Sequence, residues 1–386
     1  MGGKVFTDLR VPRLPHELYH HVRIHCQKAL RDFYVDVLSP PEAPDKPDHG
    51  DIDFLVARPI LSPIEPDDVA SSFGALKHKR IPNSKTTHYA VPLPGREHEF
   101  AQVDVHVCSE GHFHWEAFLH AYGDMMQILG VLNRPIGLTA NEKGLHIRVR
   151  EIEAKNRKRA MVFLTSDPHV AMRFLRLDVD AYEAGFQSNE QIYRWCFQGE
   201  LYSEPIMLAT TSNDRSRLRK RDMFTTCLQD WLPAHRQELF PPTRRIWTRD
   251  EVRDKALEWF PDAQRKYEEA MGHNMLEEWQ LGVLADMREK CLGELGEKAA
   301  REVIRGSKRF VDRADGAWRV NEAAPEENIG LVPVWMDHLQ TEDDKARFLE
   351  WFKENWRDVK ALETKRGKVA KDLRATAKSG RETILP

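Results

Sequence analysis

Two short stretches of the sequence carry aspartates at the spacing of one face of a β-strand. Asp51 and Asp53 stand in the run 48–56, where apolar residues surround them. Asp104 alternates with valines in the run 102–107. Side chains two residues apart in a strand point to the same face of a sheet. If the two strands are neighbours, the three carboxylates share one surface.

A surface with three clustered carboxylates repels itself unless a cation neutralises it. Oxygen ligands of this kind suit Mg²⁺ or Mn²⁺, which proteins hold with a few carboxylates together with substrate phosphates. Two such ions can activate an attacking hydroxyl and stabilise a leaving phosphate oxygen. The sequence therefore predicts that Asp51, Asp53 and Asp104 are metal ligands, with Mg²⁺ or Mn²⁺ as the cofactor.

The elements that must position these aspartates form an α+β arrangement. An amphipathic helix is expected over 16–32, and a second, short helix ends near residue 73. Strands are expected over 33–38, 51–57, 87–93 and 100–108, with a turn between the last two. Several strands joined in part by helix-bearing crossovers predict a mixed sheet with helices.

The character of the sequence changes twice further along the chain. After residue 110, a helix over 115–132 precedes two β-rich segments and a helix that starts at Ser166-Asp167-Pro168. From residue 189 onward, long and highly charged amphipathic helices dominate the pattern. The expected domains are 1–110, the mixed sheet with its helices; 111–188, a small α+β subdomain; and 189–386, an all-helical C-terminal region.

Composition narrows the class of protein. The 386 residues are 41% hydrophobic and 31% charged, which is typical of a globular protein with a sizeable core. The net charge of −3 gives no overall basic signal, so any contact with DNA or RNA has to come from local basic patches. Five scattered cysteines form no CxxC pair, and neither a signal peptide nor a membrane-spanning run is evident. We therefore expect an intracellular protein, cytoplasmic or nuclear, with no membrane partner; the oligomeric state is unknown.

The aspartate stretches resemble the polymerase β-type nucleotidyltransferase superfamily. That family places Asp-x-Asp on one strand of its palm and a third Asp on a neighbouring strand, with two divalent ions between them and a nucleoside triphosphate. The resemblance rests on the runs 49–56 and 103–105 of this chain. It implies that Asp51, Asp53 and Asp104 are catalytic residues as well as metal ligands.

The chain is also similar to the thumb of family X DNA polymerases over three further stretches. These are residues 122–127, 137–142 and 164–168, so that the resemblance covers roughly residues 33–186. In that family, the turn and helix start that correspond to the first stretch contact the incoming nucleotide. The resemblance implies that four residues lie near the nucleotide: Tyr122, Gly123, Asp124 and Gln127.

One departure from the family concerns the triphosphate. The family usually has a Gly-Ser or Gly-Gly pair about ten residues before the first Asp, where backbone amides cradle the phosphates. This chain has Pro40 and Pro41 in that region, and prolines lack the N–H donors of such a cradle. Ser39 can supply a hydroxyl and Lys46 a charge. Either the phosphate site is rebuilt, or triphosphate binding is weak or absent.

Basic side chains lie between the two acid strands in the sequence, at Lys77, Lys79, Arg80 and Lys85. They indicate either a solvated loop or an edge that binds the phosphates of a nucleotide or template. We assign them as nucleotide-binding residues because they are close to the aspartates along the chain.

The main expectation is an enzyme that moves a nucleoside monophosphate from an NTP or dNTP to an acceptor hydroxyl, with a nucleic acid 3′-OH as the favoured acceptor. An alternative is a catalytically inactive member of the fold that serves as a scaffold for nucleic acid or protein. A different metal site would use the nitrogen and sulfur ligands that zinc prefers, from His106, Cys108, His112 and His114.

Overall fold

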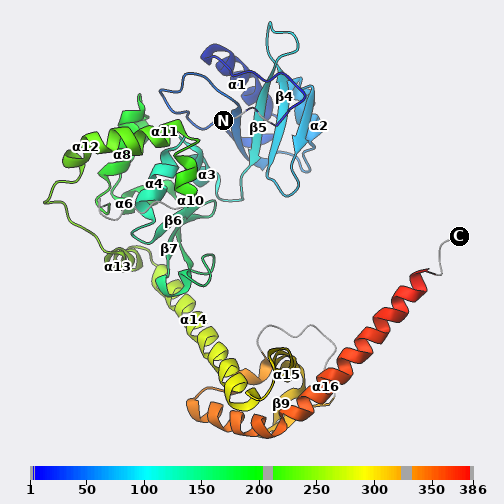
Figure 1. Cartoon of the computed structure of the whole chain (residues 1–386). Coiled ribbons are helices and arrows are strands. Elements are labelled where there is room, and N and C mark those ends of the chain that lie inside the picture. The colour runs from blue at the N-terminus through cyan, green and yellow to red at the C-terminus, as the bar shows by residue number, and fades with distance from the viewer. Residues whose placement is uncertain (1–2, 4, 203–211, 323–332, 383–386) are drawn as a thin grey trace. The chain divides into compact units, whose positions relative to one another are not determined.

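The structure, a computed structural model, describes residue 3 and residues 5–202, 212–322 and 333–382. It is a mixed α+β protein with a five-stranded mixed sheet, two smaller sheets and a helical C-terminal region (Figure 1). The chain divides into two compact units, Met1–Met271 and Gly272–Pro386. Within the described ranges, the first unit contains two hydrophobic cores and the second contains one. None of the described helices is long and apolar enough to cross a membrane.

The five-stranded sheet belongs to the first unit. Its strands are β1 (Tyr34–Leu38), β2 (Ile52–Pro59), β3 (Lys77–Arg80), β4 (Thr86–Pro92) and β5 (Phe100–Val107), in the spatial order β1-β2-β5-β4-β3. The strands β2 and β5 run parallel, and the other neighbouring pairs are antiparallel. A parallel pair requires a crossover connection, and the helix α2 (Pro66–Phe73) lies within the segment that joins β2 to β5.

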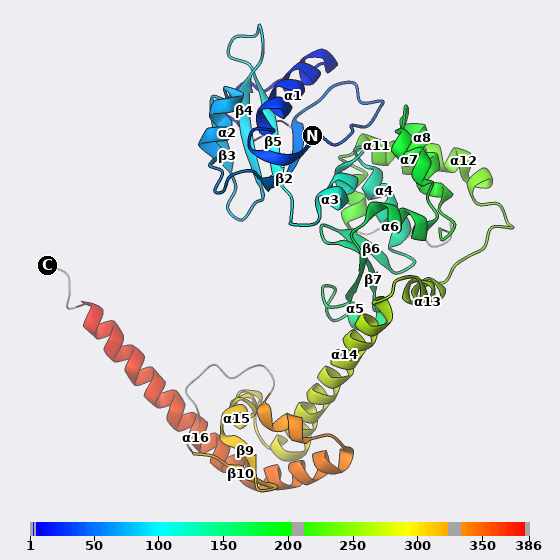
Figure 2. The same cartoon turned by 180° about the vertical axis from the view of Figure 1, so that it is seen from behind.

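One face of this sheet is covered by α2 and by α1 (His16–Leu30) (Figure 2). Ile52, Phe54 and Val56 of β2 are fully buried in the core that these helices complete. Successive side chains of a strand alternate between faces, so Asp53 is directed to the opposite face. The helices therefore determine which face of the sheet remains available for a site.

The predicted strands of this part are confirmed, but one expectation about the basic segment is wrong. Residues Lys77–Arg80 form the edge strand β3, paired with β4, where the sequence indicated a loop. Lysine and arginine are weak strand formers, and the hydrogen bonds of the β4 ladder decide the conformation instead. Charged side chains are common on edge strands, where they discourage pairing with other chains.

The rest of the first unit packs around a three-stranded antiparallel sheet in the order β6-β7-β8. Its elements are α3 (Phe113–His120), α4 (Met125–Asn133), β6 (Leu138–Asn141), β7 (Gly144–Arg148), α5 (Arg150–Glu153), β8 (Met161–Thr165), α6 (Pro168–Leu175), α7 (Val179–Ala184), α8 (Asn189–Gln198), α10 (Ser212–Arg217), α11 (Asp222–Thr225), the π-helix η1 (Thr226–Trp231), α12 (Leu232–Leu239) and α13 (Arg249–Trp259). A further helix, α14 (Ala263–Asp286), follows.

One core joins this part, from Trp115 to Ala263. It includes buried side chains on both sides of residue 188, such as Leu145 and Trp195. The predicted division into three domains stays a prediction. The predicted helix start is present, because the Asp167 side chain accepts hydrogen bonds from the first free backbone N–H groups of α6.

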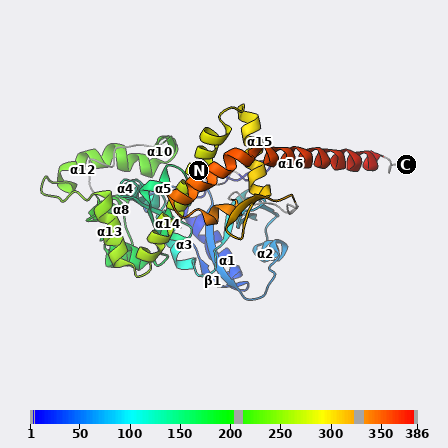
Figure 3. The same ribbon diagram turned by 90° about the horizontal axis from the view of Figure 1, so that it is seen from below.

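The second unit is helical but not all-helical, so that part of the prediction is wrong. Its elements are the π-helix η2 (Met287–Cys291), α15 (Glu297–Phe310), β9 (Val311–Ala314), β10 (Ala317–Val320), the 3₁₀-helix η3 (Val334–His338) and α16 (Glu342–Glu382), which runs alongside α15 (Figure 3). The strands β9 and β10 form a hairpin through the two-residue turn Asp315-Gly316, where both φ angles are positive (51° and 78°). Asp-Gly between two strands is a strong signal for a hairpin turn. The hairpin was missed because the residues on either side of it were interpreted as part of a helical region.

Candidate metal site and adjoining cleft

The three predicted aspartates come together on the sheet face opposite α1 and α2. Asp53 lies in β2 and Asp104 in β5, and the parallel register pairs these two residues directly. Asp51 immediately precedes β2. One carboxylate oxygen from each residue lies within 4.8 Å of those of the other two. The alternation of two neighbouring strands is therefore enough to build the cluster.

The electrostatics of the cluster fit a site for a cation. Asp53 is an exposed residue of the cleft lining. Partial desolvation by the neighbouring protein, followed by the charges of Asp51 and Asp104, raises the pKa of Asp53 to about 8. Burial and then the charge of Asp104 also raise the pKa of Asp51. Both carboxylates are thus costly to ionise without a positive partner.

Two residues that the sequence did not single out hold Asp104. Nδ1 of His88, on β4, lies 2.7 Å from Asp104 Oδ1, and Nε2 of Gln102 donates to both carboxylate oxygens at 3.0 and 3.1 Å. His88 stands directly opposite Asp104 in the β4/β5 register. Because this contact depends on which strand is the neighbour and in what register, no local pattern indicated His88. Gln102, two residues before Asp104 on the same face of β5, could have been found from the alternation itself.

A cleft of about 1830 Å³ opens at the cluster, and Asp51 and Asp53 line it. Nine cationic side chains are also part of the lining, Arg13, Lys46, Arg134, Arg148, Arg157, Lys158, Arg217, Lys220 and Arg221, together with seven further acidic ones, Glu42, Asp45, Asp48, Asp124, Glu142, Glu153 and Asp222. The cationic side chains come from the N-terminal segment, the loop before β2, and elements from α4 to α11 of the first unit. Carboxylates facing cations across a solvent-filled cleft match a ligand that carries both a metal and several phosphates.

Of the residues predicted near the nucleotide, three line this cleft: Gly123, Asp124 and Gln127. Tyr122 is buried instead, with its ring edge-on to Phe186 at 4.9 Å. Asp124 is also buried and binds Nη1 of Arg221 at 2.7 Å. Asp124 therefore presents a cation to the cleft rather than a free carboxylate.

The four basic residues assigned by closeness in the sequence lie elsewhere, and none lines the cleft. Lys77, Lys79 and Arg80 are on β3, which pairs with β4 alone and not with the acid-bearing strands. Lys77 binds the Asp8 carboxylate at 2.5 and 2.7 Å. Lys85 donates to Ser109 Oγ at 2.5 Å. The assignment of these four residues to the nucleotide site, made because they lie near the aspartates in the sequence, is therefore not supported by their positions in the fold.

The nine cationic side chains of the cleft lining, called the cationic wall from here on, were not predicted to meet. Arg134 and Arg217 both bind the buried Asp214, at 2.6 and 3.0 Å, and Asp214 thereby fixes two guanidinium groups at the cleft. The available signal was the dense basic run 215–221 inside a predicted helix. A charge run of this kind is usually a solvated helix face, so by itself it does not indicate a binding site.

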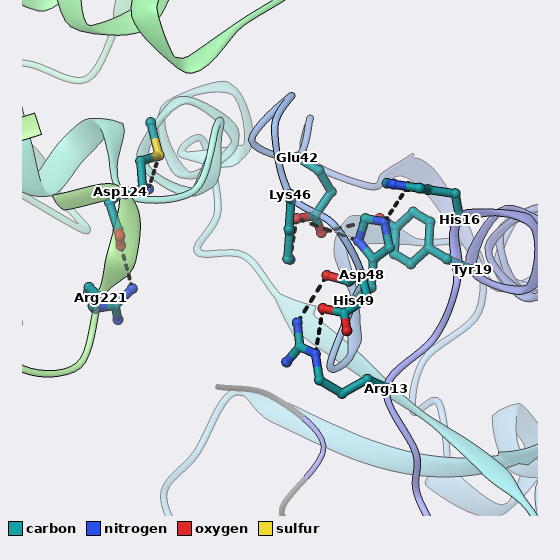
Figure 4. A network of polar contacts seen from close by, with 10 residues as sticks. Arg13, His16, Tyr19, Glu42, Lys46, Asp48, His49, Asp124 and Arg221 are labelled. Atoms are coloured by element: carbon teal, nitrogen blue, oxygen red, sulfur yellow. Dashed lines mark hydrogen bonds and ion pairs between the residues drawn. The ribbon is translucent and has the colours of Figure 1, made fainter. Parts of the chain in front are cut away.

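The loop before β2 carries Glu42, Lys46, Asp48 and His49, which are drawn in Figure 4. Pro40 and Pro41 line the cleft without N–H donors. Ser39 is not part of the lining and lies beside Tyr19. Lys46 does line the cleft, where Glu42 binds its ammonium group at 2.5 Å.

The same loop is tied to α1 through His49. The His49 ring stacks on Tyr19 with ring centroids 3.7 Å apart, and its Nε2 lies 3.1 Å from His16 Nδ1 (Figure 4). Burial lowers the pKa of His49 to about 4, against the opposing pull of Glu42, so the ring is neutral at pH 7. Arg13 closes the loop by binding Asp48 at 2.6 Å. These contacts hold the approach to Asp51 in place.

No protein-family model matches the chain, and a search of curated proteins found no match either.

Proposed function

We propose that the protein is a metal-dependent nucleotidyltransferase with a polymerase β-like palm. It moves a nucleoside monophosphate from an NTP or dNTP to an acceptor hydroxyl, with a nucleic acid 3′-OH as the acceptor. The observation that carries the proposal is the group of three aspartates on and just before the adjacent strands β2 and β5, two of which, Asp51 and Asp53, line a cleft that also contains nine cationic side chains.

The donor set fits Mg²⁺ or Mn²⁺. Asp51, Asp53 and Asp104 offer only oxygen as a ligand atom. The pKa values of Asp51 and Asp53 are raised because no cation offsets the repulsion among the carboxylates. When bound, such ions supply Lewis-acid activation of the hydroxyl and neutralisation of charge on the phosphates. His88 and Gln102 keep Asp104 oriented for this role through their hydrogen bonds.

The same residues can serve each part of the transfer step. The acceptor oxygen forms a bond to the α-phosphorus, the bond from that phosphorus to the bridging oxygen breaks, and pyrophosphate leaves with the electron pair. Asp104 occupies the family position nearest the attacking hydroxyl and is our candidate to receive its proton. Lys46, Arg13 and Arg221 line the cleft and can bind the phosphates in place of backbone amides.

The cationic wall supports a nucleic acid as acceptor. Arg217, Lys220 and Arg221 lie within one short segment of the lining, and Arg157 and Lys158 add a second group. Positive charge arranged along a cleft is what a phosphate backbone requires, whatever its sequence. We therefore expect binding of the acceptor to weaken steeply with salt.

A transfer assay tests the proposal. The protein is incubated with each α-labelled NTP and dNTP, with Mg²⁺ or Mn²⁺, and with DNA primers, RNA and the protein itself as acceptors. We expect label on a nucleic acid 3′ end with the wild-type protein and with the control Asp36→Asn, whose carboxylate binds Arg58 on the surface. Asp53→Asn should lose the signal by at least about 1000-fold, since a metal ligand is removed.

Two outcomes would contradict the proposal. Transfer that persists in Asp53→Asn would remove the metal assignment. Absence of transfer and of Mg²⁺-dependent nucleotide binding, with nucleic acid or protein still bound equally by a variant lacking all three aspartates, would favour the inactive scaffold.

A further inference from the structure

A second cluster of metal-ligating side chains lies beyond the aspartates, where β5 ends. His106 is on β5, Cys108 directly follows that strand, and Glu116 is on α3. A nitrogen, a sulfur and an oxygen atom from these three residues lie within 4.8 Å of one another. This group is distinct from the aspartate cluster in its donor atoms.

Hydrogen bonds orient two of the three donors toward one point. Thr86 Oγ1 lies 2.9 Å from His106 Nδ1, which leaves Nε2 directed at Glu116, 2.8 Å from its Oε2. The Ser109 N–H donates to Glu116 Oε1 at 2.8 Å and leaves Oε2 for the cluster. Metal-ligating histidines and carboxylates carry outer partners of this kind.

Two donors of the cluster are shielded from water. The Glu116 side chain is 1% exposed, and Cys108 is also buried. A buried carboxylate needs donors or a cation, and here the Ser109 N–H donates to Glu116 Oε1 while His106 Nε2 lies 2.8 Å from Oε2, so the carboxylate is held facing the cluster. The Cys108 thiol becomes a zinc ligand when the cation replaces its proton.

A fourth donor stands one helical turn after Glu116. His120 is four residues further along α3, so it shares a helix face with Glu116. Its ring centroid lies 5.9 Å from that of His106. Two imidazoles on one tetrahedral zinc have ring centroids about 5 Å apart, from the Zn–N bond length and the tetrahedral angle. His120 lines the cleft and is exposed, so it can make this small adjustment.

We propose that His106, Cys108, Glu116 and His120 form a binding site for one Zn²⁺ ion that braces the end of β5 against α3. Binding releases the thiol proton of Cys108 to solvent. The ring proton that His106 shares with Glu116 leaves Nε2 and is replaced, through solvent, by one on Nδ1 that is donated to Thr86 Oγ1. The hydrogen bond between His106 and Glu116 opens by about half an ångström to admit the ion at ordinary Zn–N and Zn–O lengths.

This site corrects the zinc alternative drawn from the sequence. His106 and Cys108 do converge, but their partners come from the helix rather than from the turn before it. His112 Nδ1 instead lies 2.8 Å from the backbone oxygen of Glu110, and His114 is exposed. The proposal is independent of the nucleotidyltransferase function, because thiolate and imidazole favour Zn²⁺ whereas the aspartate cluster favours Mg²⁺.

The full-length protein tests the site directly. Zinc content is measured by mass spectrometry after purification, and the metal-free protein is then titrated with Co²⁺. We expect one equivalent of bound Co²⁺ with the near-ultraviolet charge-transfer band of a cobalt–thiolate bond. Cys108→Ser should lose the band, while Cys291→Ser and the double variant Asp51→Asn/Asp53→Asn should keep it. Circular dichroism checks that each variant is folded.

The ligand set has its own readout. Glu116→Gln and His120→Ala should each lower the affinity for Zn²⁺ by about tenfold or more, the usual effect of removing a ligand or its support. If Cys108→Ser does not fold, the band must survive in serine variants of the other four cysteines, which assigns it by elimination. Absence of a cobalt–thiolate band in the wild-type protein, or its retention in folded Cys108→Ser, would overturn the site. Unchanged affinity in His120→Ala would overturn the four-ligand arrangement.

Discussion

At the scale of single residues, Asp53 combines a metal-ligand type of side chain with a raised pKa. Its carboxylate lines the cleft, with oxygens of Asp51 and Asp104 within 4.8 Å. The pKa of Asp53 is raised to about 8, mainly by desolvation and then by these two neighbours. Ionisation of this group therefore destabilises the metal-free fold as the pH rises above the ordinary range of an aspartate.

The first prediction follows from the sign of that shift. The folded state binds the Asp53 proton more tightly than the unfolded state, so the penalty appears above about pH 4 and grows toward pH 8. We expect metal-free Asp53→Asn to melt at a higher temperature than wild type at pH 8, and the difference to vanish near pH 4. Differential scanning calorimetry across this pH range measures it. A difference independent of pH would contradict the assignment.

The second prediction concerns His88, whose ring holds Asp104. His88→Ala should raise the Mg²⁺ concentration needed for half-maximal transfer by about tenfold to a hundredfold, because the metal ligand loses its orienting partner. His98→Ala, at a position in the turn between β4 and β5, is the matched control and should behave as wild type. A change in maximal rate at unchanged Mg²⁺ dependence would assign His88 a different role.

At the scale of elements, the β9–β10 hairpin is decided by two turn residues. Asp315 and Gly316 both have positive φ, which suits a two-residue hairpin turn and favours glycine. A Cβ at Gly316 would meet no atom within 4 Å, so the cost of adding one comes from the backbone conformation alone. Because a steric clash does not contribute, a substitution at Gly316 tests the backbone conformation of the turn alone.

The third prediction compares two glycines. Gly316→Ala should lower the free energy of unfolding by about 1 kcal/mol, because alanine is strained at a φ of +78°. Gly272→Ala, inside α14 and also without a neighbour within 4 Å, should raise it by about 0.5–1 kcal/mol. Urea unfolding measures both changes. Equal effects of the same sign would argue against the turn conformation.

At the scale of the whole molecule, the two compact units have separate hydrophobic cores and separate clusters of buried or closely spaced charges, which we call their electrostatic anchors. The buried Glu363 of α16 binds Arg305 of α15 at 2.7 Å and Arg366 at 2.9 Å. Burial by itself would raise the pKa of Glu363, but the hydrogen bonds from Arg366 and Arg305 outweigh it, and the pKa is lowered. This anchor belongs to the second unit, whereas the aspartate cluster belongs to the first.

The fourth prediction is that these anchors act on different unfolding transitions. Mg²⁺ at about 100 times its Kd should stabilise the first unit by about 2.7 kcal/mol. Glu363→Gln should destabilise the second unit by about 2 kcal/mol, a value reduced because its arginine partners reach water. The control Glu354→Gln, on the exposed side of α16, should have no effect.

Calorimetry with and without Mg²⁺ separates the two effects. The contribution of Glu363 is present above the ordinary pKa of a glutamate and is lost as the pH falls through its lowered value. Acid should therefore erase the difference between wild type and Glu363→Gln. A Mg²⁺ effect on both transitions would contradict independent anchors.

The sequence by itself determined the features that depend on local periodicity. The alternation around Asp51, Asp53 and Asp104 was sufficient to predict the strands of Asp53 and Asp104 and the meeting of the three carboxylates on one face. The metal that they would hold stays a prediction. The helix start at Asp167 followed in the same way from the residues that can cap a backbone N–H. Such features need only the chain's own geometry over a few residues.

The tertiary structure alone decided which distant residues meet. The contact of His88 with Asp104 depends on strand order and register, and the contact of Glu116 with His106 depends on how α3 returns to β5. The cations of the cleft come from segments far apart in the chain, while the nearer Lys77 and Arg80 lie on the edge strand β3. Side-chain convergence is a consequence of packing between elements, and no pattern within one element encodes it.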